Sequence, residues 1–432
     1  MGGVSMRPLG LTLKGRGLVI TGSDMNSSGS TADLEAQGIP VAIGHRAENI
    51  EGADCIIRTA AVHNDNPEIA AARAAGIPVF ERAQAWGAIM REFSNALCIA
   101  GTHGKTTATS MMTHILMAAE ADPTVMIGGF LPLLGAGHRV GKGDTIVLES
   151  CEYCDSFLNF YPTVAVILNI EADHLDYFKD LEDIKKSFRR FAELSRDAVI
   201  ANGDDPETIS ALQGIPFLSF GMGDQNRVHP TGLSPDFRHF DVVCDGKIYC
   251  HVDLNVIGRH NALNALAAAA TAWFMGIAPQ AVTEGLGGFY GANRRMQHKG
   301  TFHGAEIYDD YAHHPGELAA TLAAAVTIPH NRLIVAFQPH TYTRTHALFD
   351  DFVRELKKPD LTIVAEIYAA RERNTVGISS RDLVREIPGS IYCETLPDVT
   401  ECLRSVIRPG DVVLTIGAGD IYRAGDALLK ND

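Results

Sequence analysis

The sequence predicts an α/β protein with three consecutive domains, mainly because short apolar runs alternate with helical stretches along the whole chain. Uninterrupted apolar runs of this kind are typical of parallel strands that are buried on both faces of a sheet. The length of 432 residues is the second reason, because one domain usually holds about 100–200 residues. We place the three domains at residues 1–94, 95–293 and 294–432.

The first domain is expected to contain a parallel sheet, with strands at residues 18–20, 55–57 and 76–80 and a helix at residues 67–75. The chain opens with Met1-Gly2-Gly3-Val4-Ser5-Met6, a glycine-rich loop with no strand before it. Either the true start site lies upstream of Met1, or this domain lacks its opening strand. Pro8 is expected to break the helix that should follow, because proline has no backbone N–H to donate.

The other two domains show the same alternation. Apolar runs predict strands at residues 97–100, 145–148, 164–168, 305–308, 333–337, 361–364 and 412–416. The alanine-rich segment 261–275 predicts a helix, and Gly276 is a suitable stop signal after it.

Composition narrows the class of protein. The formal charge of −15 argues against nonspecific binding to a nucleic acid, which needs clustered positive charge. We see neither a membrane-spanning apolar stretch nor a secretory signal, so we expect a cytoplasmic protein without a membrane partner. The eight scattered cysteines fit a reducing compartment. Cys151-x-x-Cys154 allows a redox or zinc role, but two buried thiols near a strand end are the favoured interpretation.

A phosphate-binding loop is the strongest local motif. The segment Gly101-Thr102-His103-Gly104-Lys105-Thr106-Thr107 follows a predicted strand and precedes a predicted helix at residues 108–119. Backbone N–H groups and the helix N-terminus can bind an anion there, with Lys105 on the outer phosphates and Thr106 on magnesium. Only the Gly-Lys-Thr end of the general motif is matched, so a glycine-rich turn with a surface lysine is the alternative.

Two further residues are candidates for the metal site. Glu149 ends one predicted strand and His174 follows another, and the carboxyl ends of parallel strands meet at one edge of the sheet. Glu149, His174 and Thr106 are therefore expected to converge on Mg²⁺, although histidine is an unusual ligand for this hard ion. The remaining acids nearby are interpreted as solvated charges, namely Glu152, Asp155, Glu171, Asp173 and Asp176.

The chain as a whole resembles the Mur ligases. The phosphate loop and Glu149 are followed, in the family's order, by Asn169-Ile170-Glu171-Ala172-Asp173-His174-Leu175-Asp176, Gly258-Arg259-His260-Asn261-Ala262-Leu263-Asn264, Asn293-Arg294-Arg295, Asp309-Asp310-Tyr311-Ala312-His313-His314-Pro315 and Phe337-Gln338-Pro339-His340-Thr341-Tyr342-Thr343-Arg344-Thr345. This resemblance implies a central P-loop ATPase domain between a Rossmann-like N-terminal and a Rossmann-like C-terminal domain.

The resemblance also implies roles for individual residues. It implies catalytic roles for Lys105, Glu149, His174 and Arg295, and a magnesium site at Thr106, Glu149 and His174. ATP would bind Gly101, Thr102, His103, Gly104, Lys105, Thr106, Thr107, Asn261, Asn264, Arg295 and Asp310. The incoming amino acid would bind His340 and Arg344, and the UDP-sugar would bind Gly2, Gly3, Ser5, Ser23, Asp24 and Thr59.

The implied activity is an ATP-dependent ligation in peptidoglycan precursor synthesis. His313-His314 and Phe337-Gln338-Pro339-His340 resemble the family branch that joins L-alanine to UDP-N-acetylmuramate through an acyl phosphate, with Mg²⁺ as cofactor. One alternative is a family member that attaches a preformed peptide in cell-wall recycling. Another is a noncatalytic sensor of UDP-sugar or ATP that descends from such a ligase.

Overall fold

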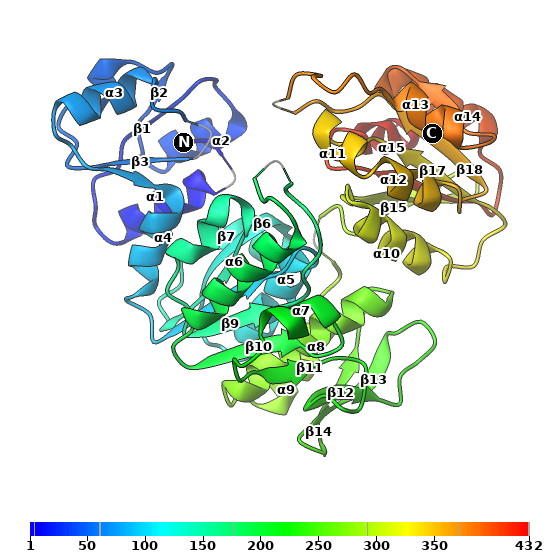
Figure 1. Ribbon diagram of the computed structural model, residues 1–432, viewed down its shortest axis with the longest axis horizontal. Coiled ribbons are helices and arrows are strands. Elements are labelled where there is room, and N and C mark those ends of the chain that lie inside the picture. Colours follow the sequence, from blue (N-terminus) through cyan, green and yellow to red (C-terminus); the bar gives the residue numbers. More distant parts are fainter. Residues whose placement is uncertain (4, 60–61, 176, 292, 371, 431–432) are drawn as a thin grey trace.

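The computed structural model describes residues 1–3, 5–59, 62–175, 177–291, 293–370 and 372–430. Asp176, one of the acids considered above, lies outside this set. Figure 1 shows three α/β units, with the first at the upper left, the third at the upper right and the central one below them. Among the described residues, none of the helices has the length and apolar character that crossing a membrane requires. In the part of the chain that the structure describes, none of the eight cysteines forms a disulfide.

The first unit holds two separate two-stranded parallel sheets, β1–β2 and β3–β4. Its elements are α1 (Met6–Gly15), β1 (Gly22–Asp24), α2 (Gly29–Ala36), β2 (Val41–Ile43), η1 (Ala47–Ile50), β3 (Ile56–Arg58), α3 (Pro67–Ala74), β4 (Val79–Glu81) and α4 (Arg82–Met90).

Two expectations for this unit are wrong. Pro8 does not break α1, because it lies in the first turn, where the backbone N–H has no partner within the helix in any case. Residues 18–20 form no strand, and the side chains of Leu18 and Val19 are exposed. The strand begins later, at Gly22, because pairing with β2 rather than apolar character decides its position.

The central unit contains a ten-stranded sheet in the order β14-β13-β12-β11-β10-β9-β5-β8-β6-β7. Its strands are β5 (Asn95–Ala100), β6 (Thr124–Leu131), β7 (Ala136–Arg139), β8 (Thr145–Glu149), β9 (Val164–Ile167), β10 (Ala198–Asn202), β11 (Leu218–Phe220), β12 (Val228–Thr231), β13 (His239–Cys244) and β14 (Lys247–Asp253). Its helices are α5 (Lys105–Ala118), η2 (Pro132–Leu134), η3 (Tyr153–Asn159), α6 (Leu181–Glu193), α7 (Pro206–Ala211), α8 (Arg259–Phe274) and α9 (Pro279–Gly287).

Apolar residues cover both faces of this sheet. Leu97 and Ile99 of β5 pack in one core with α5, α8 and α9, whereas Ala96 and Cys98 pack in the other with α4 and α6. Successive side chains of a strand point to opposite faces, so a run buried on both faces must be apolar throughout. This explains why the strands predicted at 97–100, 145–148 and 164–168 are found in the sheet.

The third unit contains a six-stranded sheet in the order β15-β16-β20-β17-β18-β19, parallel except for β15. Its strands are β15 (Gln297–Phe302), β16 (Ala305–Asp310), β17 (Leu333–Phe337), β18 (Leu361–Ala365), β19 (Ile391–Cys393) and β20 (Val412–Ile416). Its helices are α10 (Pro315–Ala325), α11 (Tyr342–Ala347), α12 (Phe349–Leu356), α13 (Ser380–Glu386), α14 (Leu396–Val406) and α15 (Tyr422–Leu429).

Candidate active site

The predicted phosphate loop joins β5 to α5 at the carboxyl edge of the central sheet. Gly104 precedes the helix with φ = 84°, a left-handed conformation that favours glycine. A Cβ at this position would also lie 2.5 Å from the side-chain oxygen of Asn264 on α8. Glycine is therefore required here both by the backbone and by the close approach of α8.

Asn169 fixes the other side of this loop. Its side-chain oxygen accepts from the backbone N–H of His103 at 2.8 Å, and its Nδ2 donates to the carbonyl oxygen of His103 at 3.0 Å. Next to it, the Thr102 hydroxyl oxygen accepts from the backbone N–H of Glu171 at 2.8 Å. The segment that follows β9 thus holds the loop in one conformation.

Lys105 forms a buried ion pair with Glu152. Its Nζ lies 3.0 Å from Glu152 Oε2 and also donates to the carbonyl oxygens of Gly101 and Thr102. Burial would lower the pKa of Lys105, but the Glu152 carboxylate outweighs this effect and raises the pKa above its ordinary value. The interpretation of Glu152 as a solvated charge is wrong, because this side chain is 3% exposed.

Thr106 and Glu149 meet as expected for a magnesium site. The Thr106 hydroxyl lies 3.0 Å from both carboxylate oxygens of Glu149, and the backbone N–H of Gly128 donates to Glu149 at 2.7 Å. A hydroxyl and a carboxylate are the oxygen ligands that Mg²⁺ prefers, so these residues fit the ion. His174 instead faces carboxylates nearby, with its Nε2 3.7 Å from Glu152 and 3.7 Å from Asp173.

A cavity of about 290 Å³ extends from the phosphate loop to the third unit. Seven residues predicted to bind ATP line it, namely His103, Gly104, Thr107, Asn261, Asn264, Arg295 and Asp310. Gly101, Thr102, Lys105 and Thr106 lie beside it in the same loop and helix but do not line it. This cavity therefore connects residues that are up to about two hundred positions apart in the chain.

The third unit presents Arg295 and Asp310 to this cavity. The Arg295 guanidinium lies 3.8 Å from Glu317 Oε1 and over the ring of Tyr311. Asp310 is buried, and its carboxylate accepts from the backbone N–H groups of Met296 and Ala312. Burial raises the pKa of Asp310. Two of the hydrogen bonds that the Asp310 carboxylate can accept are thus used to fix the backbone at Met296 and Ala312.

The predicted amino-acid pocket contains an ion pair between two units. The Arg344 guanidinium lies 3.2 Å from Asp173 Oδ1, and its Nη1 lies 3.3 Å from His340 Nδ1. Burial would raise the pKa of Asp173, but Arg344 and the nearby histidines hold it below its usual range. The His340 ring stacks on Tyr368. Asp173 is therefore a paired charge and not a solvated one.

The residues predicted to bind UDP-sugar gather around two strand ends of the first unit. Gly2, Gly3 and Ser5 precede α1, Ser23 and Asp24 end β1, and Thr59 follows β3. Asp24 accepts from the backbone N–H of Gly2 at 2.8 Å, and the Ser23 hydroxyl donates to Glu68 at 2.7 Å.

Sequence reasoning missed the partners of the predicted residues. Glu152, Asn169, Asp173 and Glu317 each contact a predicted site residue, yet none of them stands out by spacing. Their position offered one signal, because all except Glu317 directly follow β8 or β9 at the edge where the phosphate loop lies.

Comparison with known proteins identifies the family. Family models match residues 1–94 ("Mur ligase family, catalytic domain"), 99–272 ("Mur ligase middle domain") and 294–419 ("Mur ligase, glutamate ligase domain"). UDP-N-acetylmuramate–L-alanine ligases of Agathobacter rectalis and Caldanaerobacter subterraneus subsp. tengcongensis are 43% and 42% identical to the chain. Each alignment covers 100% of this chain and 96% of the relative. The chain belongs to the Mur ligase family.

Solved structures agree with this Mur ligase assignment. The UDP-N-acetylmuramate–alanine ligase MurC of Thermotoga maritima is 28% identical, with a TM-score of 0.82 over 99% of this chain and 96% of that one. A murein peptide ligase of Psychrobacter arcticus, 21% identical with a TM-score of 0.70 over 99% and 96% of the chains, shares the fold. The predicted three-domain α/β architecture is confirmed.

The buried pair of this Mur ligase predicts a specific pattern of stability. Lys105→Met leaves the Glu152 carboxylate buried without its partner, so it should destabilise the central domain by about 3 kcal/mol. Adding Glu152→Gln removes the unpaired charge and should recover most of that loss. Urea unfolding of the wild type and of the single and double variants measures both effects. An additive double variant would show that the two side chains do not interact.

Proposed function

We propose that this Mur ligase joins L-alanine to UDP-N-acetylmuramate with hydrolysis of ATP, as a step of peptidoglycan precursor synthesis. The observation that carries the proposal is the cavity in which the phosphate loop of the central domain faces Arg295 and Asp310 of the third. The names of its relatives at 43% and 42% identity support the choice of substrates. Because these substrates are soluble nucleotides and an amino acid, we place the reaction in the cytoplasm.

We assign one substrate to each domain, with boundaries at residues 1–94, 95–293 and 294–432. The strand ends around Ser23, Asp24 and Thr59 would bind the UDP-sugar. The phosphate loop, Asn261 and Asn264 would bind ATP, with Asp310 near the ribose. His340 and Arg344 would bind L-alanine, whose carboxylate would take the place of Asp173 on the Arg344 guanidinium.

The chemistry requires activation of a carboxylate, because a carboxylate does not react with an amine at neutral pH. Its oxygen attacks the γ-phosphorus of ATP, and ADP leaves, which forms an acyl phosphate. The amine of alanine then attacks the acyl carbon, and the resulting tetrahedral adduct expels inorganic phosphate. Lys105 and Arg295 would neutralise the negative charge that spreads over the transferred phosphoryl group.

Thr106 and Glu149 would hold Mg²⁺ beside the phosphates, with His174 as a further candidate ligand. The bound ion supplies positive charge where the phosphoryl group is transferred. In the structure Glu152 already neutralises Lys105, so the lysine is held in place before ATP arrives. Closure of the domains around the cavity would exclude water, which otherwise hydrolyses an acyl phosphate.

An assay of substrate choice tests the proposed function. The purified protein with ATP, Mg²⁺ and UDP-N-acetylmuramate should release phosphate and form the alanyl product when L-alanine is added. A tripeptide in place of L-alanine should give no product, whereas a peptide ligase of cell-wall recycling would give the reverse. A sensor without activity would release no phosphate in either reaction.

Glu149→Gln should weaken the binding of magnesium that the reaction requires. The substitution keeps the shape of the side chain but removes the charge that faces Thr106. The Mg²⁺ concentration that gives half the maximal rate should rise by about tenfold or more. Glu182→Gln, at a side chain that is 68% exposed on α6, is the control and should leave it unchanged. Equal magnesium dependence in wild type and Glu149→Gln would contradict this assignment.

Arg344→Lys should raise the KM for L-alanine by about tenfold or more, with a smaller effect on the KM for ATP. Arginine binds a carboxylate through two parallel hydrogen bonds, which lysine cannot reproduce. Steady-state kinetics with each substrate varied separately measures both constants. Arg354→Lys, an exposed arginine of the same domain, serves as the control. If both constants rise equally, Arg344 acts in domain closure and not as the anchor of alanine.

A further inference from the structure

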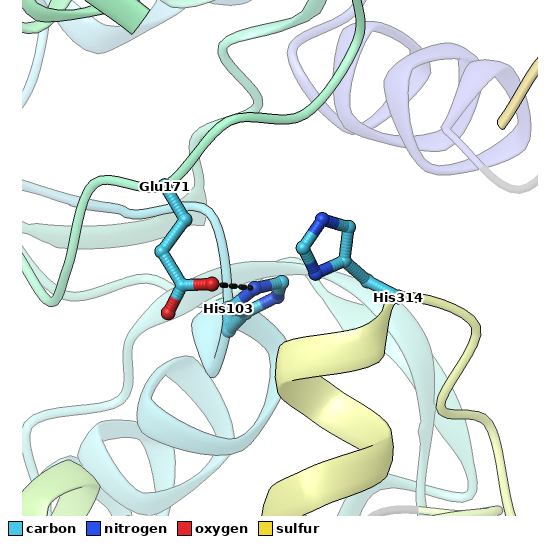
Figure 2. Close-up of side chains that lie close together, drawn as sticks. All are labelled: His103, Glu171 and His314. Carbon is cyan, nitrogen blue, oxygen red and sulfur yellow. Dashed lines mark hydrogen bonds and ion pairs between the residues drawn. The ribbon is translucent and has the colours of Figure 1, made fainter. Parts of the chain in front are cut away.

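Two imidazoles and one carboxylate from three distant segments converge where the central domain meets the third. His103 belongs to the phosphate loop, Glu171 to the segment after β9, and His314 precedes α10 (Figure 2). One potential ligand atom of each lies within 4.8 Å of the other two. Sequence spacing gave no support for a metal site at His313-His314, because the other two ligands are more than a hundred residues away.

The three side chains are held close together. His103 Nε2 lies 3.2 Å from Glu171 Oε2, and the rings of His103 and His314 are 4.8 Å apart. Gly316 makes this approach tolerable, because a Cβ there would lie 2.7 Å from Glu171 Oε2 and 3.4 Å from His103 Nε2. The start of α10 therefore sits directly against the pair formed by His103 and Glu171.

Both ring nitrogens of His314 have hydrogen-bond partners in the structure, and a metal would replace one of them. Its Nδ1 accepts from the backbone N–H of Gly316 at 3.2 Å, and its Nε2 lies 3.1 Å from the carbonyl oxygen of Ala172. The neutral ring with its proton on Nε2 satisfies both partners, so a metal bound at Nδ1 would replace the hydrogen bond from Gly316. Burial lowers the pKa of His314, which also favours the neutral form.

A second carboxylate lies beside the His103 ring. The Nε2 of His103 faces Glu171, while its Nδ1 lies 3.4 Å from Glu317 Oε1 on the opposite side of the ring without forming a hydrogen bond. Histidines that bind metals commonly direct their other ring nitrogen toward a carboxylate, which orients the ring. The carboxylates of Glu171 and Glu317 also provide the negative charge that a dication requires.

We propose that His103, Glu171 and His314 form a binding site for a zinc-class transition-metal ion that links the central and third domains. Two nitrogens and one carboxylate suit Zn²⁺ or Co²⁺ better than Mg²⁺, which prefers oxygen ligands only. Three protein ligands also leave a coordination position open. The site is separate from the magnesium pair Thr106 and Glu149, and the proposal goes beyond the proposed ligase activity and does not depend on it.

The bound ion would connect the phosphate loop directly to α10. Because His103 is part of that loop and His314 belongs to the third domain, an ion held by both fixes the two domains relative to each other. The competing explanation is a simple ion pair, in which a protonated His103 lies between Glu171 and Glu317. In that explanation burial would lower the pKa of His103 but the two carboxylates raise it to about 9, His314 serves as the N-cap of α10, and no metal ion is bound.

Metal binding to the full chain tests the proposal. Chelator-treated protein without nucleotide is titrated with Zn²⁺ by equilibrium dialysis and with Co²⁺ by visible absorption, which reports nitrogen ligation. We expect one ion per chain, bound at least about tenfold more weakly in His314→Gln and in Glu171→Gln. His298→Gln is the matched control, because His298 pairs with Glu306 at 2.5 Å on the surface of β15 without a third ligand. It should bind the ion like the wild type.

Three results would overturn the proposal: no Zn²⁺ binding by the wild type, unchanged affinity in both site variants, or an equal loss in Glu149→Gln. The last result would place the ion at the magnesium site. Melting curves recorded without metal show whether each variant folds. Glu171 is 45% exposed on its side chain, so Glu171→Gln decides the question if His314→Gln does not fold.

Discussion

The parallel pairing of β5 with β8 on one side and β9 on the other determines where the site residues lie. In this register Ile99 pairs with Glu149, and Ala100 pairs with Ile167. Each of the three strands therefore ends at the same edge, and the residues that follow them meet there. The phosphate loop, the Thr106–Glu149 pair and the Asn169 contacts all depend on this pairing. Apolar cores on both faces keep the three strands in place.

The third domain meets this edge mainly through charged and polar groups. Arg344 pairs with Asp173, His103 lies near Glu317, and His314 contacts the carbonyl oxygen of Ala172. Polar interfaces between domains of one chain are typical of domains that move relative to each other. This suits a ligase that must admit three substrates and then close around them. In the structure, Asp173 of the central domain pairs with Arg344, the arginine that we assign to the carboxylate of alanine.

The sequence predicted the elements that local chemistry determines, and it failed where distant contacts decide. The phosphate loop could be located because its seven residues contain two glycines and a lysine and join a predicted strand to a predicted helix. Residues 18–20 are as apolar as a strand, but pairing begins four residues later. Glu152 looks like any surface acid, and only the fold reveals that Lys105 is its partner. The meeting of His103 with His314 likewise depends on how two domains pack. The roles of the individual site residues stay predictions.

The central claim is that the cavity at this sheet edge transfers a phosphoryl group from ATP to the carboxylate of the sugar substrate. Isotope transfer tests it most directly. UDP-N-acetylmuramate with ¹⁸O in its carboxylate is turned over with ATP and L-alanine, and the phosphate released is analysed by mass spectrometry. An acyl phosphate intermediate predicts that one labelled oxygen appears in each inorganic phosphate. Phosphate that is free of label, formed together with the alanyl product, would contradict the mechanism.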